Sequence, residues 1–370
     1  MTEALGMGVV GAGAIGIRAA LMHLSKPDVQ DRVRLAAVCD PIPGRAEAAA
    51  KKFGVPAHYL AYEELLADPH VDMVTICSPI RLHFVQGMQA IAAGKHIHFN
   101  KTMTTTTAEA DEIISAAAKK DVKIVASPGM ILFPHNQRER RLVLNQELGR
   151  LAWVLSGASG VGDYHMNEEY RTGKDILTDV NPAWYFQKPG GGPQYDVTVY
   201  CLHILTAILG PARRVTAMSG IVIPERDYHG QKITCEIDDT TMLTLDFGDS
   251  LFALVYATAK GGITEGFQPN IYGTKASIVG TKFGDRDLKQ PYDFPPHVTG
   301  EHCQMAESHV FEDMMQLTEW VRDGQPSIAT AEHARHVIEI IEAGYAAAES
   351  GKAQELHTSF TPLPLEALEE

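Results

Sequence analysis

The sequence feature that most constrains the fold is a glycine pattern near the N-terminus. Gly11, Gly13 and Gly16 follow an apolar run, Gly6–Val10, and open a segment with a helical pattern, Ala14–Leu24. In a strand–turn–helix unit, the first glycine permits the tight turn, the second lets the backbone approach a pyrophosphate, and the third lets helix and strand pack closely. The helix start then offers unpaired N–H groups to phosphates. The pattern therefore predicts a dinucleotide-binding turn.

An acidic residue ends the second apolar run, Val33–Cys39. Asp40 is placed to accept hydrogen bonds from the ribose hydroxyls and to repel a 2′-phosphate, which favours NAD over NADP. Arg45 keeps NADP open as the less favoured cofactor, since its guanidinium could pair with a phosphate. The alternative is a glycine-rich turn beside a solvated aspartate. The expected cofactor contacts of this unit are Gly11, Gly13, Ala14, Ile15, Gly16, Asp40 and Arg45.

The pattern of apolar residues changes after about residue 130. Before it, short apolar runs alternate with helical segments, which is typical of βαβ units and a parallel sheet. After it, Leu243–Phe247 and Phe252–Tyr256 alternate apolar and polar residues around a Gly-Asp-Ser turn, which predicts an antiparallel hairpin with one buried face. Asn270–Val279 is expected to add another strand. We predict an α/β chain with a Rossmann domain (1–130) and an α+β domain with an open-faced, mostly antiparallel sheet (131–370).

Composition excludes several classes of protein. The 370 residues are 45% hydrophobic and 21% charged, and the net charge is −14, which argues against a nucleic acid or an anionic membrane as partner. Five scattered cysteines without a CxxC pair, no signal peptide and no long apolar run favour a cytoplasmic protein. The acidic end after Thr361 is expected to be loose.

Further motifs resemble the Gfo/Idh/MocA oxidoreductases, the group that contains glucose–fructose oxidoreductase and inositol dehydrogenase. The family segment P-x-x-x-H, a helix, then a-G-k-h-V and E-K-P is matched by Pro79–His83 and by Ala93–Thr102. Lys101 falls on the family's active-site lysine, although Asn100 replaces Glu and Thr102 replaces Pro. The resemblance implies that Lys101 and the strand-end residues Ser78, Pro79 and His83 lie at the cofactor.

A second family motif, G-G-G followed by Asp and then His or Tyr, is matched by Gly190–Gly192, Asp196 and Tyr200. Helical spacing places Asp196, Tyr200 and His203 on one face. Oxidation of an alcohol needs a group that accepts the hydroxyl proton. Tyr200 or Lys101 is expected to do so, because a nearby ammonium stabilises a phenolate, and Asp196 is expected to bind a substrate hydroxyl.

Structural explanations exist for the same residues. Tyr200 could be a half-buried core tyrosine, Asp196 a first-turn acid favoured by the helix dipole, and Lys101 an exposed strand-end lysine. His203 could be a core histidine and His83 a residue that orients its helix. The further substrate contacts that we predict are Trp184, Tyr164, His165 and His203.

Two pairs of histidines raise the question of a metal. His302 and His309 lie near Glu301 and Glu307, and His333 and His336 are about one helical turn apart. Neither pair has further ligands at matching spacing, so we predict no metal.

The sequence thus predicts an NAD-dependent dehydrogenase for a secondary hydroxyl of a sugar, cyclitol or glycoside, with C3 as one position of oxidation. Two alternatives remain. One is a redox-neutral glycosidase that oxidises, cleaves by elimination and reduces again; the other is a dinucleotide-binding regulator without catalysis. The family's open-faced sheet also implies a homodimer or homotetramer.

Overall fold

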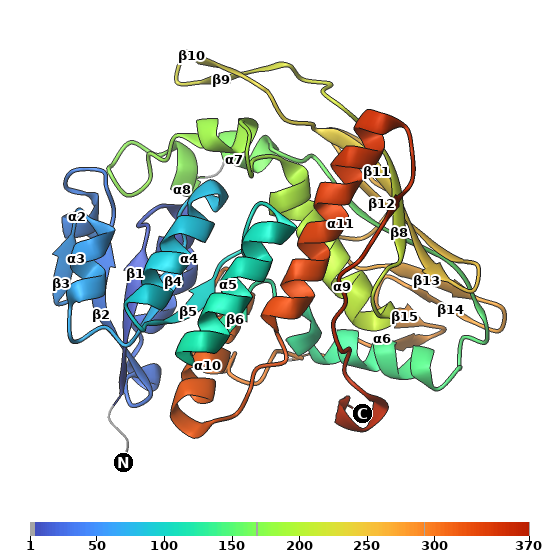
Figure 1. Ribbon diagram of the computed structural model, residues 1–370, viewed down its shortest axis with the longest axis horizontal. Coiled ribbons are helices and arrows are strands. Elements are labelled where there is room, and N and C mark those ends of the chain that lie inside the picture. The colour runs from blue at the N-terminus through green and yellow to red at the C-terminus, as the bar shows by residue number, and fades with distance from the viewer. Residues whose placement is uncertain (1–3, 168, 292, 370) are drawn as a thin grey trace. The chain divides into compact units, whose positions relative to one another are not determined.

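The computed structural model describes residues 4–167, 169–291 and 293–369, and it divides the chain into two compact units (Figure 1). Unit 1 comprises Met1–Pro128, His165–Pro182 and Pro296–Ala331, and unit 2 comprises Gly129–Tyr164, Ala183–Pro295 and Glu332–Glu370. The first division falls between Pro128 and Gly129. Two later segments, however, belong to unit 1, where long-range contacts hold them.

Unit 1 is built on six parallel strands in the order β3-β2-β1-β4-β5-β6. The expected Rossmann architecture is confirmed. Its central strands β1 and β4 are almost wholly buried, as is typical of parallel sheets covered on both faces. The strands are β1 Leu5–Val10, β2 Val33–Cys39, β3 Ala57–Tyr59, β4 Met73–Ile76, β5 His96–Phe99 and β6 Ile124–Ala126.

The helices of unit 1 follow local sequence signals. Thr106 caps α5 in a capping box, since its hydroxyl accepts the Glu109 N–H at 3.2 Å and the Glu109 carboxylate accepts the Thr106 N–H at 3.1 Å. The helix expected over Ala14–Leu24 contains a π-helical segment, Gly16–Leu21. The α-helices are α1 Met22–Leu24, α2 Arg45–Phe53, α3 Tyr62–Ala67, α4 His83–Ala92, α5 Thr107–Lys120, α8 Glu169–Thr172 and α10 Ser308–Asp323; α7 is Asp163–Asn167.

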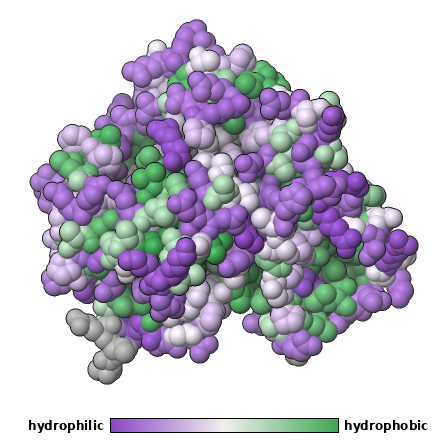
Figure 2. Space-filling model, viewed as in Figure 1, coloured by the Kyte–Doolittle hydropathy of each residue, from purple (hydrophilic) through white to green (hydrophobic). Residues whose placement is uncertain are grey.

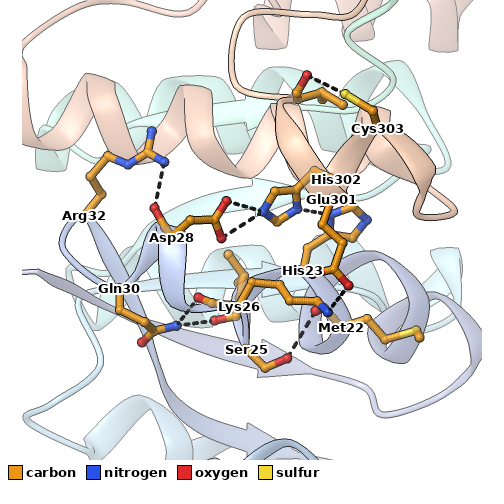
Figure 3. Close-up of polar contacts among 12 residues, drawn as sticks. Met22, His23, Ser25, Lys26, Asp28, Gln30, Arg32, Glu301, His302 and Cys303 are labelled. Carbon is orange, nitrogen blue, oxygen red and sulfur yellow. Dashed lines mark hydrogen bonds and ion pairs between the residues drawn. The ribbon is translucent and has the colours of Figure 1, made fainter.

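Buried polar contacts hold Pro296–Ala331 in unit 1. His302 Nδ1 lies 2.7 Å from His23 Nδ1, and its other ring nitrogen faces Asp28 at 3.3 Å (Figure 3). Farther along, the Asp313 carboxylate accepts the Ser127 hydroxyl, which lies 2.9 Å from His98 Nε2. The contacts of His302 and Asp313 join residues 186 to 279 positions apart, so no local sequence pattern predicts them.

Unit 2 contains a nine-stranded mixed sheet in the order β16-β15-β14-β13-β7-β12-β11-β8-β17, in which β7 and β12 are parallel and the other pairs antiparallel. The expected mostly antiparallel sheet is confirmed. The elements are α6 Pro134–Leu144, β7 Leu151–Ser159, α9 Val199–Leu209, β8 Arg214–Gly220, β9 Glu225–Tyr228, β10 Gln231–Thr234, β11 Thr240–Gly248, β12 Leu251–Thr258, β13 Asn270–Gly273, β14 Ser277–Val279, β15 Lys282–Phe283, β16 Arg286–Asp287, α11 Ala331–Ser350 and β17 Gln354–Glu355.

One face of this sheet exposes large apolar side chains. Met218 and Met242 are directly opposed on β8 and β11, and Phe252 opposes Trp153 on β12 and β7. Met218 is 80% exposed and the other three are 44–49% exposed. On the face of the molecule shown in Figure 2, hydrophilic residues predominate with hydrophobic residues between them, as is usual for a protein surface.

Two expectations about unit 2 need correction. Asn270–Val279 forms two short strands, β13 and β14, rather than one. The end of the chain is anchored rather than loose, because Arg140 donates to the Leu363 carbonyl at 2.7 Å and Leu368 is 5% exposed. None of the described helices is long and apolar enough to cross a membrane.

Candidate active site

The glycine loop of unit 1 has the geometry that a dinucleotide requires. Gly11 has a φ of +94°, and a Cβ on Gly16 would lie 1.9 Å from the Gly11 carbonyl oxygen, so neither position accepts a side chain. A Cβ on Gly13 would meet one described atom within 4 Å, Val180 Cγ1 at 3.9 Å. Backbone is therefore accessible at Gly13, and Ala14 and Ile15 follow it at the start of the helix. The residues present fit a pyrophosphate.

Asp40 braces this loop. Its carboxylate accepts the Ala12 N–H and the Ile42 N–H, both at 2.9 Å, and the residue is 4% exposed. Each carboxylate oxygen has two lone pairs, so Asp40 can still accept ribose hydroxyls while it holds the loop. Arg45 lies 3.8 Å from Asp40 and also donates to the Ile176 and Asp179 carbonyls, each at 2.9 Å. Arg45 is thus engaged with the chain itself.

The strand-end residues after β4 are tied together by His83, which is 1% exposed. Its Nδ1 lies 2.7 Å from the Thr102 carbonyl and its Nε2 lies 2.9 Å from the Ser78 carbonyl. Burial lowers the pKa of His83 to about 4, although both carbonyls favour the charged ring. The Ser78 hydroxyl donates to Gln86 at 2.5 Å, and Pro79 precedes the next helical turn. His83 therefore joins the backbone after β4 to the backbone beyond Lys101.

Lys101 follows β5 at the carboxyl edge of the sheet, where ligands of such folds bind. The Asn100 side chain accepts the Lys101 N–H at 2.7 Å. Asparagine thus fixes the backbone at the position where the family has glutamate. The Lys101–Thr102 peptide bond is cis.

Glu307 is a functional candidate that its sequence context indicated only as a neighbour of possible metal ligands. Arg18 lies 3.2 Å from Glu307, and His309 lies 3.9 Å from it. Burial raises the pKa of Glu307, but the charges of His309, Arg18, Lys101 and Arg171 together lower it below its usual value. The charge of Lys101 therefore acts on a half-buried carboxylate, which sequence alone could not reveal because more than 200 residues separate the two.

His165 is also part of unit 1 and is 1% exposed. Arg171 donates to its Nδ1 at 3.1 Å, so the proton of the neutral ring is on Nε2. Burial, then the charges of Arg171 and Lys101, lower the pKa of His165 well below its ordinary value. The neutral His165 ring, which can donate a hydrogen bond through Nε2, is therefore near enough to Lys101 for that charge to affect its pKa.

Asp196 and Tyr200 lie in unit 2 and are 5% and 8% exposed. Asp196 belongs to a π-helical turn, Gln194–Thr198, and Tyr200 to the first turn of α9. The Tyr200 ring stacks on Phe267 with centroids 4.9 Å apart.

His203 has different surroundings from Tyr200. It is 3% exposed, and its ring lies 4.6 Å from that of His333 on α11. Burial lowers the pKa of His203 to about 3. These contacts are those of a core histidine, one of the two interpretations that the sequence left open.

Trp184 and Tyr164 flank the same buried ring. Each meets Tyr185 edge to face, with centroids 5.9 and 6.3 Å away, and each is itself half-buried. They remain candidates for contact with a sugar.

The histidine pairs considered for a metal have protein partners. His333 lies 2.7 Å from the Thr206 hydroxyl, and His336 accepts the Ala212 N–H at 3.0 Å. Within residues 4–167, 169–291 and 293–369, no group of three or more His, Cys, Asp or Glu side chains could hold a metal ion. All five cysteines are free thiols.

Comparison with known proteins agrees with this geometry. Residues 5–127 match the family model of the oxidoreductase family with an NAD-binding Rossmann fold, and residues 137–279 match the GFO/IDH/MocA C-terminal domain. The chain is 27% identical over 375 residues to D-glucoside 3-dehydrogenase of Escherichia coli, covering 95% of this chain and 97% of that one. It is 26% identical over 310 residues to trans-1,2-dihydrobenzene-1,2-diol dehydrogenase of Mus musculus, covering 80% and 82%.

Solved structures share the whole fold. Levoglucosan dehydrogenase in complex with NADH and levoglucosan superposes with a TM-score of 0.74 at 18% identity, covering 96% of this chain and 100% of that one. The glycine loop, the fixed Lys101 backbone and the two matching family models lead to one conclusion: this chain is an NAD-dependent oxidoreductase of the Gfo/Idh/MocA family.

Proposed function

We propose that this protein oxidises a secondary hydroxyl of a sugar or glycoside, with C3 of a glucoside as the position of first choice. The observation that carries the proposal is Lys101 at the carboxyl edge of the Rossmann sheet, where Asn100 fixes its backbone and its charge acts on Glu307, His165 and His309. The similarity to D-glucoside 3-dehydrogenase over almost the full length of both chains supports the choice of substrate.

NAD, when bound, supplies the hydride acceptor of the reaction. In our proposal Lys101 and Tyr200 take up the hydroxyl proton, since an ammonium group favours a phenolate and a positioned base contributes about 10²–10⁴ to a rate. Asp196 accepts a hydrogen bond from a substrate hydroxyl. His165, whose Nε2 carries the proton, donates to a substrate oxygen, and Trp184 and Tyr164 offer apolar ring faces to the sugar.

Incubation with NAD and a range of glucosides, anhydrosugars and inositols tests the proposal through the absorbance of the reduced cofactor. We expect NADH with at least one glucoside, and loss of it in Lys101→Met and Tyr200→Phe. Lys119→Ala, which removes an exposed charge from α5, is the matched control and keeps full activity. Full activity in both Lys101→Met and Tyr200→Phe would refute the assigned roles.

We further propose that the exposed sheet face of unit 2 (Trp153, Met218, Met242 and Phe252) is the interface with a second copy of this chain. We also propose that the protein acts in the cytoplasm. Contiguous exposed apolar patches mark interaction sites. In an isologous contact the same patch of each copy faces its counterpart, so this face would be buried against itself.

A further inference from the structure

A segment of unit 1 lies over the glycine loop. Residues 173–182, here called the strap, bring Val180 Cγ1 to 3.9 Å from where a Gly13 Cβ would be. Ile176 Cδ1 likewise lies 3.4 Å from the Cβ position of Gly44, in the turn between β2 and α2. In Figure 1 the strap is part of the green segment beside α2. It therefore lies beside two turns of the cofactor site: the glycine loop, which fits the pyrophosphate, and the turn after Asp40, whose carboxylate can accept the ribose hydroxyls.

The strap has its own internal structure. The Asp175 carbonyl accepts the Thr178 N–H at 3.0 Å and the Asp179 N–H at 2.8 Å, and the Asp175 carboxylate accepts the Leu177 N–H at 2.8 Å. These bonds close a compact turn. They join the strap to itself, so its position over the glycine loop depends on other contacts.

Arg45 supplies such a contact from the first residue of α2. Its Nε donates to the Ile176 carbonyl and one terminal nitrogen donates to the Asp179 carbonyl, both at 2.9 Å. The other terminal nitrogen lies 3.8 Å from Asp40 Oδ1. All three guanidinium nitrogens thus face groups of the chain, and the side chain is 14% exposed. One arginine joins the strap to the carboxylate that faces the ribose.

We propose that Arg45 is the clasp that holds the strap over bound NAD, and that this clasp, rather than Asp40 alone, sets the selectivity for NAD over NADP. The inference rests on the dinucleotide site assigned above. A 2′-phosphate recruits an arginine through forked hydrogen bonds, and Arg45 can form these only by releasing Ile176 and Asp179. Release would also leave Asp40 without its positive neighbour and facing the phosphate. NADP can therefore bind only when Arg45 has released the strap, and Asp40 then repels its 2′-phosphate. NAD binds while Arg45 keeps its contacts with the strap.

The test compares wild type with Arg45→Ala and Arg45→Lys, without reference to turnover. Lysine keeps the charge beside Asp40 but lacks the fork that reaches two carbonyls. The readouts are the Kd of NAD and of NADP by calorimetry, the dissociation rate of NAD by stopped-flow fluorescence, and tryptic cleavage after Lys174, an exposed residue of the strap. Lys51→Ala, exposed on the same helix, is the control.

We expect NAD to protect Lys174 from trypsin in wild type and in Lys51→Ala. In both Arg45 variants that protection is lost and NAD dissociates about tenfold faster or more, as expected for the loss of charge-assisted hydrogen bonds. In Arg45→Ala the ratio of the Kd of NADP to the Kd of NAD decreases, because NADP no longer has to displace Arg45 from the strap. Unchanged NAD dissociation and protection in both variants would overturn the proposal, and so would a selective loss of NADP binding, which would make Arg45 a phosphate ligand. Absence of NAD binding in wild type would instead refute the dinucleotide site.

Discussion

Lowering the pH from 7 to 5 is expected to destabilise this protein through buried histidines, and His336 shows the effect most clearly. His336 is fully buried, and its Nε2 accepts the Ala212 N–H at 3.0 Å. A backbone N–H can only donate, so Nε2 must be unprotonated, and Nδ1–H then faces the Thr358 hydroxyl at 3.0 Å. Protonation of Nε2 would bring its N–H against the Ala212 N–H, and two donors cannot form a hydrogen bond with each other.

The magnitude follows from the pKa. Burial lowers the pKa of His336 from 6.5 to about 4, against the smaller opposing effects of Glu339 and Thr358. Between these values the unfolded chain binds the proton and the folded chain does not. The free energy of unfolding is therefore unaffected above pH 6.5 and falls as the pH drops toward 4. Each pH unit costs about 1.4 kcal/mol, so His336 alone should cost about 2 kcal/mol by pH 5.

His336→Gln isolates this effect. The glutamine Oε1 can take the place of Nε2 and accept the Ala212 N–H, but it does not titrate. Denaturant unfolding at pH 7 and pH 5 should show the variant losing about 2 kcal/mol less than wild type over this interval. His58→Gln, at an exposed position, is the control and should match wild type. An identical loss in His336→Gln and wild type would refute the reasoning.

Two further predictions concern other parts of unit 2. Glu139 is fully buried, and among the described residues neither of its carboxylate oxygens has a hydrogen-bond partner. Burial raises its pKa well above the ordinary value, so the free energy of unfolding falls as the pH rises above about 4.5. Glu139→Gln should unfold at pH 7 with a free energy about 1–3 kcal/mol higher than wild type, and a less stable variant would contradict this. Met218→Lys, on the exposed sheet face, should convert the proposed oligomer to a monomer in light scattering, whereas Ile42→Lys in unit 1 should not; a wild-type monomer would exclude the oligomer.

Local signals predicted the parts of the site that local structure builds. The Gly11–Gly16 turn, Asp40 after β2 and Lys101 after β5 are all set by where a strand ends, and the strand pattern is visible in the sequence. Glu307 and the strap could not be predicted in this way. Their places depend on Arg18 and Arg45, side chains more than 120 residues away, and such pairings leave no periodic trace.

The helix that carries the family motif shows the same limit. Spacing alone placed Asp196, Tyr200 and His203 together, but it does not indicate what packs against each side chain. Tyr200 stacks on Phe267, whereas His203 meets His333. The contacts of α11 and of the loop between β12 and β13 decide this, and they arise only in the folded unit.

The most direct test of the central claim follows deuterium from a glucoside labelled at C3 into NAD, measured by mass spectrometry of the cofactor. The account predicts one deuterium atom in each molecule of accumulated NADH, and no labelled NADH with Lys101→Met. Glucoside cleaved with the label back in the sugar and no net NADH would identify the redox-neutral glycosidase. Firm NAD binding with no label transferred from this or any other ring-deuterated sugar would contradict the proposed dehydrogenase.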